Sequence, residues 1–116
     1  MDGLQTFEED MSDLAGLKAA FNAYQENVQN NSSEMIMQRI QELNDFSTDM
    51  LFFLSFAQKW CRSHSREQTI LKISKSVHSP ERYRVNGALS NLKEFAETFN
   101  CSLGSPMNPT KKCESW

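Results

Sequence analysis

Two carboxylates stand four residues apart near the start of the chain, at Glu9 and Asp13. In a helix this spacing puts both side chains on one face, with their Cβ atoms about 6 Å apart. Acids placed in this way can bind a cation or a basic group, but ordinary solvated acids at a helix start show the same pattern. The spacing alone therefore leaves both interpretations open.

A second candidate pair is His78 and Arg84, which stand six residues apart around a His-Ser-Pro turn. The imidazole can donate a hydrogen bond and the guanidinium carries a fixed positive charge, so the two could bind an oxyanion or a carbonyl oxygen. The alternative is an unrelated surface histidine and surface arginine.

Three cysteines, at positions 61, 101 and 113, offer another kind of chemistry. Together with His64, the thiols of Cys61, Cys101 and Cys113 could form a four-ligand zinc site. Structural zinc sites usually have two closely spaced ligand pairs, and the wide gap in the second pair argues against such a site. In an oxidised protein, an odd number of cysteines leaves at least one thiol that needs a partner outside the chain.

Composition and missing motifs narrow the functional classes. The first 58 residues hold 10 acids and 2 bases, whereas the rest of the chain holds 5 acids and 10 bases. The basic half has no aromatic platform for stacking bases, so we expect no nucleic-acid partner. The longest apolar run, residues 50–54, is too short to span a bilayer, and the N-terminus lacks the pattern of a signal peptide. Asn30 and Asn31 each begin an Asn-x-Ser triplet and are glycosylation candidates.

Helical periodicity supplies the elements that position these groups. An apolar stripe predicts a helix over residues 9–29, a weaker helical pattern follows over residues 34–43, and a third predicted helix covers residues 45–61. The third is apolar nearly all round, and the rest of the chain has few large apolar side chains to cover it. It is therefore expected to oligomerise or to belong to a larger body.

The second half of the chain is also predicted to be helical. A helix over residues 66–77 must stop before Pro80, and Asn91 with Glu94 resembles an N-cap that opens a short helix. Gly104, Pro106 and Pro109 predict an irregular tail. No extended period-two pattern is present, so the predicted fold class is all-α, as one domain over residues 1–116.

Several motifs in order resemble the neprilysin and endothelin-converting enzyme family of zinc metalloendopeptidases. They are the Glu-x-x-x-Asp segment, an apolar helix ending in Trp-Cys, a His-Ser-Pro turn followed by arginine, and a Pro-Met-Asn-Pro tail with a final Cys-x-x-Trp. These motifs occupy residues 6–17, 51–61, 78–84, 104–109 and 113–116. The resemblance covers the whole chain and implies the C-terminal helical portion of a larger peptidase catalytic domain.

The resemblance implies a role for each candidate. Glu9 matches the third zinc ligand, and Asp13 matches an acid that orients a ligand histidine. His78 matches the residue that stabilises the oxyanion, and Arg84 the one that holds a substrate carbonyl. Trp60 matches a wall of the apolar pocket for the residue after the scissile bond. The His-Glu-x-x-His helix that supplies the other zinc ligands is not in this chain.

The sequence departs from the family pattern at several positions. Glu8 replaces a usual glycine, Asp10 a usual asparagine, and Lys59 a usual valine beside the pocket tryptophan. The polar stretch over residues 29–50 also differs. Extra negative charge beside Glu9 could alter zinc affinity, and Lys59 makes the pocket less apolar than the family pattern implies.

The resemblance also implies that Cys61, Cys101 and Cys113 each pair with an upstream cysteine. From this we expect a C-terminal fragment whose missing partner is the N-terminal part of the peptidase. The expected parent hydrolyses peptides outside the cell, either secreted or as the ectodomain of a plasma-membrane protein. The alternative is a catalytically inactive helical binding or scaffold protein that uses the apolar helix over residues 45–61.

Overall fold

The computed structural model describes residues 2–30 and 45–114, and within these ranges the chain is helical. The only β-type pairing among the described residues is an isolated bridge between Ser105 and Asn108. The all-α prediction is therefore confirmed. The weaker helix predicted over residues 34–43 lies outside the described residues. The helices are α1 (Gly3–Asn30), α3 (Thr48–Lys59), α4 (Arg66–Lys75), α5 (Glu81–Asn91) and α6 (Lys93–Thr98).

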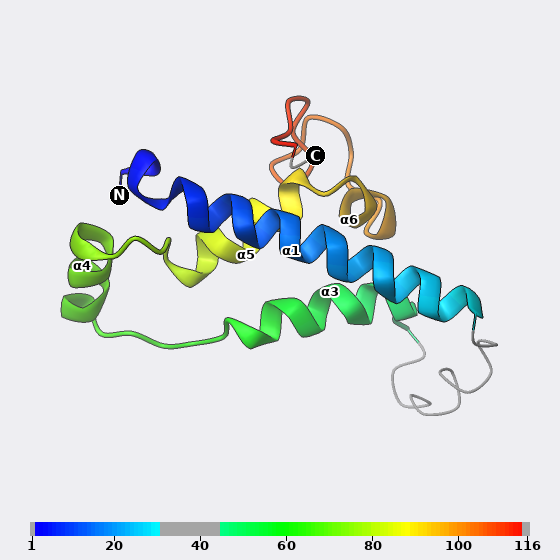
Figure 1. The fold of residues 1–116 in the computed structure, drawn as a ribbon, viewed down its shortest axis with the longest axis horizontal. Helices are drawn as coiled ribbons and strands as arrows, with labels where there is room; N and C mark the ends of the chain where they lie inside the picture. The colour runs from blue at the N-terminus through cyan, green and yellow to red at the C-terminus, as the bar shows by residue number, and fades with distance from the viewer. Residues whose placement is uncertain (1, 31–44, 115–116) are drawn as a thin grey trace.

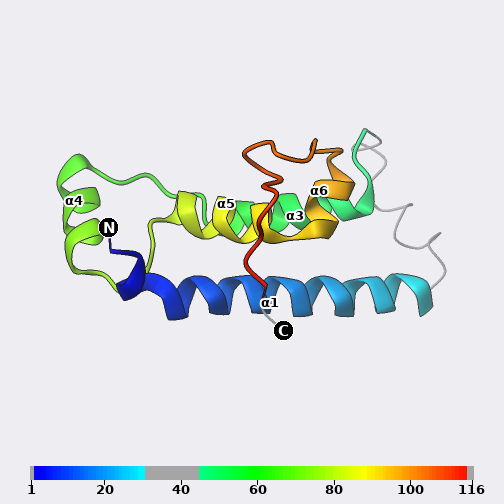
Figure 2. The same cartoon turned by 90° about the horizontal axis from the view of Figure 1, so that it is seen from above.

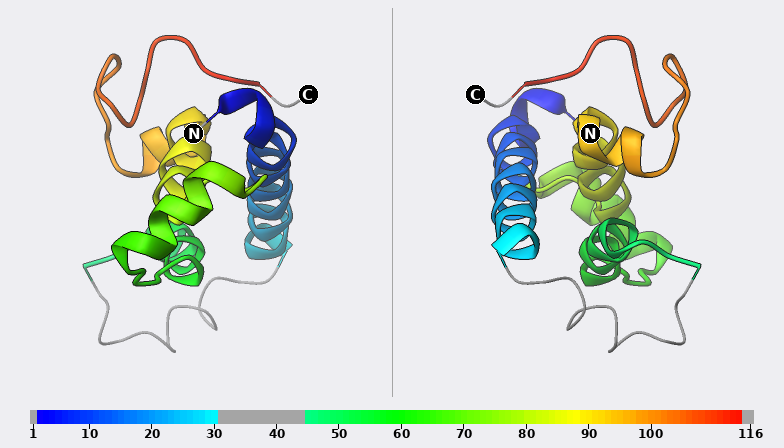
Figure 3. Two further views of the ribbon diagram at one scale, coloured as in Figure 1. Left: turned by 90° about the vertical axis from the view of Figure 1, so that its left-hand side faces the viewer. Right: turned by 90° about the vertical axis from the view of Figure 1, so that its right-hand side faces the viewer.

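The helices form two layers. Figure 1 shows α1 running along the length of the molecule, and Figure 2 shows α3, α5 and α6 together on one side of it. The end-on views in Figure 3 separate α1 from the other layer. α1 packs chiefly against α5, while α4 stands at the end of the molecule near the N-terminus (Figure 1). None of the described helices combines the length and the hydropathy needed to cross a membrane.

α1 begins at Gly3, earlier than the apolar stripe predicts. Asp2 explains the difference, because its Oδ1 accepts a hydrogen bond from the backbone N–H of Leu4 at 3.0 Å. Its carbonyl oxygen accepts another from Gln5 at 3.2 Å. An aspartate at this position satisfies backbone N–H groups that a helix start otherwise leaves free.

The predicted apolar stripe of α1 is confirmed where it faces the second layer. The helix ends at the exposed Asn30, one of the two glycosylation candidates, and Asn31 lies outside the described residues. The large side chains that the stripe buries are Leu14, Leu17 and Phe21.

The core between the layers is a cluster of aromatic rings. Phe53 of α3 is 1% exposed and stacks on Phe21 of α1, with ring centroids 4.9 Å apart. Phe95, in α6, meets the Phe53 ring edge-on at 5.5 Å, and Phe52 stacks on Tyr24 at 5.0 Å. The expectation that the chain lacks the side chains to cover α3 is therefore wrong for its inner face, because α1 and α6 supply them.

The sequence pattern does not predict α5. In the structure the carbonyl oxygen of Pro80 accepts hydrogen bonds from the backbone N–H groups of Tyr83 at 2.8 Å and Arg84 at 3.2 Å, which starts the helix. Its buried residues are only Ala88 and Leu89. With so few apolar residues the helical period is weak, and the packing against α1 stabilises the helix instead.

The prediction that Asn91 is a helix N-cap is wrong. Asn91 is the last residue of α5, and its Nδ2 donates to the carbonyl oxygen of Gly87 at 2.8 Å. Leu92 has extended backbone, with φ −90° and ψ 122°, and precedes α6 without a side-chain cap. Oδ1 of Asn91 accepts a hydrogen bond from the backbone N–H of Cys113 at 2.6 Å. The side chain thus fastens the tail to α5.

α4 is held by its N-terminal cap. The Ser65 hydroxyl accepts a hydrogen bond from the backbone N–H of Gln68 at 3.3 Å, and the Gln68 side chain accepts one from the backbone of Ser65 at 3.0 Å. This reciprocal capping box fixes the start of the helix. The helix ends at Lys75, slightly before the predicted residue 77, and none of its residues is buried. Beyond α6 the described tail is irregular, as predicted, and Gly104 takes a φ of +86°.

Candidate functional site

The first half of α1 lies beside the segment from His78 to Arg84, and this contact brings the predicted site residues together. Nε2 of His78 is 3.3 Å from Oε2 of Glu9. Nη2 of Arg84 is 3.8 Å from the same carboxylate oxygen. The Glu9 side chain is 41% exposed, so its carboxylate is open to solvent while two basic groups lie beside it.

Arg84 and Asp13 form the most enclosed ion pair of the site. Nε of Arg84 donates to Oδ2 of Asp13 at 2.5 Å, and Nη2 donates to Oδ1 at 2.6 Å. The two side chains are 13% and 12% exposed. The hydrogen bond to Asp13 raises the pKa of Arg84 above its ordinary value, although burial acts in the opposite direction. The two parallel bonds therefore orient a fixed positive charge and leave the N–H groups on Nη1 unused by Asp13.

Trp60 forms the third side of this cluster. The guanidinium carbon of Arg84 lies 4.2 Å from the centroid of its ring, within the range of a cation–π contact. Nε1 of Trp60 is buried and has no hydrogen-bond partner among the described residues. The indole therefore presents an apolar face to Arg84 and keeps one N–H donor.

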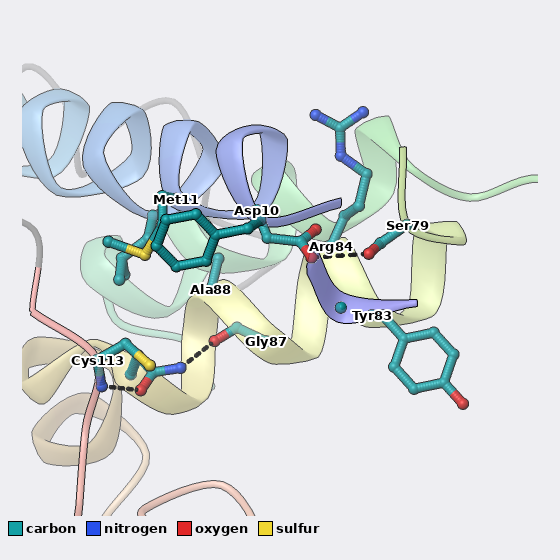
Figure 4. Close-up of a pocket in the computed structure, with 12 residues that line it drawn as sticks. Asp10, Met11, Ser79, Tyr83, Arg84, Gly87, Ala88 and Cys113 are labelled. Atoms are coloured by element: carbon teal, nitrogen blue, oxygen red, sulfur yellow. Dashed lines mark hydrogen bonds between the residues drawn. The ribbon is translucent and has the colours of Figure 1, made fainter. Parts of the chain in front are cut away.

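One contact that the sequence does not predict fastens the turn to α1. Ser79 is fully buried, and its Oγ donates to Oδ2 of Asp10 at 2.8 Å (Figure 4). Asp10 is next to Glu9 in α1, and Ser79 is next to His78. The hydrogen bond therefore holds the carboxylate of Glu9 and the imidazole of His78 in place relative to each other. No spacing rule links residues so far apart in sequence, so the sequence gives no signal for this contact.

Two cavities flank the cluster. The first, of about 270 Å³, lies between α1 and α5, and Figure 4 shows Asp10 and Ser79 beside it. The second, of about 460 Å³, lies between α1 and α3. Its walls include Asp13, Leu17, Phe52, Phe56, Lys59 and Trp60.

The other candidate metal ligands, His64 and the three cysteines, form no ion pair with Glu9 or Arg84 in the part of the chain that the structure describes. Nε2 of His64 contacts Oε1 of Glu81 at 3.1 Å. Cys61 and Cys113 are exposed, Cys101 is half-buried, and all three are free thiols in the structure. Their pairing with upstream cysteines stays a prediction.

The described residues do not form a complete metal site. Within residues 2–30 and 45–114, no three histidine, cysteine, aspartate or glutamate side chains lie close enough together to hold a metal ion. This finding gives no support to the four-ligand site considered for His64 and the cysteines. Catalytic zinc usually takes three protein ligands. Any zinc bound at Glu9 therefore needs donors from outside the described residues.

Comparison with known proteins identifies relatives along the whole chain. The model of peptidase family M13 matches residues 1–115. All 116 residues align with neprilysin-3 of Drosophila melanogaster at 46% identity and with an endothelin-converting enzyme homologue of Locusta migratoria at 47%. Endothelin-converting enzyme 1 of Rattus norvegicus is 46% identical over the same span. The chain covers 14% of the length of the first relative and 15% of the other two.

Proposed function

Because the chain belongs to peptidase family M13, we propose that it is the C-terminal part of a zinc-dependent endopeptidase catalytic domain that hydrolyses peptides. In this proposal Glu9 is one zinc ligand, Asp13 and His78 serve the reaction, and Arg84 and Trp60 bind the substrate. The other two zinc ligands would come from a His-Glu-x-x-His helix in the N-terminal part of the peptidase. Zinc in the complete ligand set would supply Lewis-acid chemistry.

The observation that carries the proposal is the convergence of groups from four parts of the chain. Glu9 of α1, His78 of the turn and Arg84 of α5 meet around one carboxylate oxygen. Trp60, which follows α3, lies against Arg84. A structural ion pair needs one acid and one base, whereas this group adds an accessible carboxylate, an imidazole and an aromatic wall. That combination is typical of a site that binds a polar ligand.

The geometry supports separate tasks for the two acids. Asp13 uses both carboxylate oxygens to hold Arg84, so it acts here as a group that positions the guanidinium. The Nη1 donors of Arg84 can then bind a backbone carbonyl of the peptide. Glu9 is more exposed and has looser contacts, which leaves its carboxylate able to act as a ligand. Nε2 of His78 lies beside it and can donate a hydrogen bond to oxygen that becomes negatively charged.

The test of this proposal is a matched pair of variants in the full-length protein. Glu9→Gln keeps the size of the side chain but removes the charged donor, so zinc content and cleavage of a quenched peptide should both fall by at least tenfold. Glu8→Gln removes a charge from the adjacent exposed residue and should retain both. Zinc is counted by elemental analysis of the purified protein. Full zinc content and full activity in Glu9→Gln would refute the assignment.

The 116-residue chain by itself makes a second test. One carboxylate cannot hold catalytic zinc, so we expect no cleavage of the same peptide when zinc is added. Appreciable cleavage that a chelator abolishes would contradict the proposal. Sequencing the coding region upstream distinguishes the enzyme from the alternative of an inactive binding protein. An in-frame His-Glu-x-x-His helix supports the enzyme, and a stop codon supports the inactive binding protein. Burial of Phe53 in the core leaves less of α3 for docking than that alternative expects.

A further inference from the structure

The cavity between α1 and α3 has a particular distribution of charge. Most of its walls are apolar and include Leu17, Phe52, Phe56 and Trp60. Asp13 also lines it, but both oxygens of Asp13 accept hydrogen bonds from the fixed positive charge of Arg84. This carboxylate is therefore already neutralised by its partner.

Lys59 is the other charged group on the cavity wall. It is exposed at the end of α3, and its Nζ lies 5.6 Å from the centroid of the Trp60 ring. Within the part of the chain that the structure describes, no carboxylate forms an ion pair with it. The cavity thus has an apolar body and an unpaired ammonium group beside Trp60.

We propose that Lys59 makes this cavity select an acidic side chain. The inference rests on the proposed function, in which a peptide lies against Arg84 and Trp60 and the cavity beside Trp60 takes the side chain that follows the scissile bond. The methylene groups of a glutamate would pack against the aromatic walls while its carboxylate pairs with Nζ of Lys59. A lysine or arginine at the same position would meet a like charge.

The size of the preference follows from the exposure of Lys59. Because solvent screens an exposed pair, we expect discrimination between glutamate and glutamine of about fivefold, the upper end for such pairs. The apolar walls contribute equally to both side chains, since these have nearly the same shape. The preference should also weaken as salt is added, because ions screen exposed charges.

The experiment compares peptides that differ only at the residue after the cleaved bond, carrying glutamate, glutamine or lysine, with the full-length peptidase. For the unchanged protein we expect kcat/KM to be about fivefold higher for the glutamate peptide than for the glutamine peptide. Lys59→Met keeps the length of the side chain without its charge and should bring this ratio close to one. Lys59→Glu should favour the lysine peptide. Lys75→Met, a matched change at an exposed lysine of α4, should leave the ratio at its original value.

The outcomes separate the inference from the proposed function. Equal ratios in the unchanged protein and in Lys59→Met, with cleavage intact, overturn the inference and leave the peptidase assignment standing. A protein that holds zinc but cleaves none of the peptides overturns both. Dissociation constants for uncleavable analogues of the glutamate and glutamine peptides provide a second measurement, and they should show the same ratio.

Discussion

The site and helix α4 contrast in how they are held. Beside the site, α1 and α5 pack against each other, with Leu14, Ala88 and Leu89 buried among apolar neighbours. In α4 no residue is buried, and Ile70 and Leu71 are 57% and 56% exposed. The site is stabilised by packing and by the enclosed ion pair of Arg84 and Asp13. Helix α4 is stabilised by its N-terminal capping box and by an ion pair whose lysine is partly exposed.

This difference shows which part of the site's geometry the chain can hold by itself. The contacts among Glu9, Asp13, His78 and Arg84 involve helices with their own core, so their positions follow from packing within the described residues. α4 is linked to α5 mainly by Glu81, which contacts both Lys72 and His64. Mutations should therefore have large effects in the first region and small effects in the second.

The largest effect is expected at Phe53, the most buried ring of the core. Phe53→Ala should lower the free energy of unfolding by about 3 to 5 kcal/mol, because it removes contacts with rings from both layers and leaves a cavity. Leu54→Ala, at the neighbouring 37% exposed position, should cost less than about 1 kcal/mol. Denaturant unfolding followed by circular dichroism measures both. Equal losses would mean that α3 does not bury the face seen here.

The next effect is expected at the enclosed ion pair. Arg84→Met should cost about 2 to 3 kcal/mol, because it leaves the carboxylate of Asp13 largely buried without its partner. Lys93→Met makes the matched change in the pair of Lys93 and Glu97, whose side chains are 76% and 61% exposed, and should leave the free energy of unfolding almost unchanged. The same unfolding measurement applies. A loss at Arg84 as small as that at Lys93 would contradict the enclosed geometry.

The sequence predicts the well-packed helices better than it predicts the site. Leu14, Leu17 and Phe21 repeat at helical spacing because one face of α1 is buried, so the pattern indicates the helix directly. In α5 the weak period around Gly87 carries no such signal, and Asn91 resembles an N-cap although it ends a helix. The spacing of residues along the chain predicts helices because the hydrogen bonds of a helix join residues that are close in sequence.

The convergence of the site residues is a tertiary effect. Spacing places Glu9 and Asp13 on one face of α1, but nothing local shows that Arg84 lies against that face. The family resemblance selects Glu9, His78 and Arg84 as candidates, and the structure gives the distances between them. The hydrogen bond between Ser79 and Asp10 is missed for the same reason, since it depends on the packing of a turn against α1.

A smaller, pH-dependent effect is expected where α4 meets α5. The hydrogen bond from Lys72, aided by His64, lowers the pKa of Glu81 to about 2 from its ordinary value of 4.5. Because the folded state favours the charged form, this stabilisation is fully present above pH 4.5 and is lost as the pH falls toward 2. Partial exposure of Lys72 and His64 limits its size to about 1 kcal/mol.

Glu81→Gln tests this link between the two regions. The difference in unfolding free energy between the unchanged protein and the variant should be greatest near neutral pH and should shrink below pH 4.5. Glu94→Gln is a suitable control, since Glu94 forms no ion pair with Lys72 or His64. A difference that stays constant across this pH range would mean that Glu81 does not hold α4 in solution.

The smallest effect is expected on the exposed face of α4. Ile70→Ser should change the free energy of unfolding by less than about 0.5 kcal/mol, because the side chain buries little surface within the chain. Leu89→Ser, which places a hydroxyl among buried apolar side chains of α5, should cost several times more. If Ile70→Ser costs as much as Leu89→Ser, α4 must pack against another surface in solution, and the contrast between the two regions would disappear. A small change in the free energy of unfolding at Ile70 would show that the exposed face of α4 contributes little to the stability that packing provides beside the site.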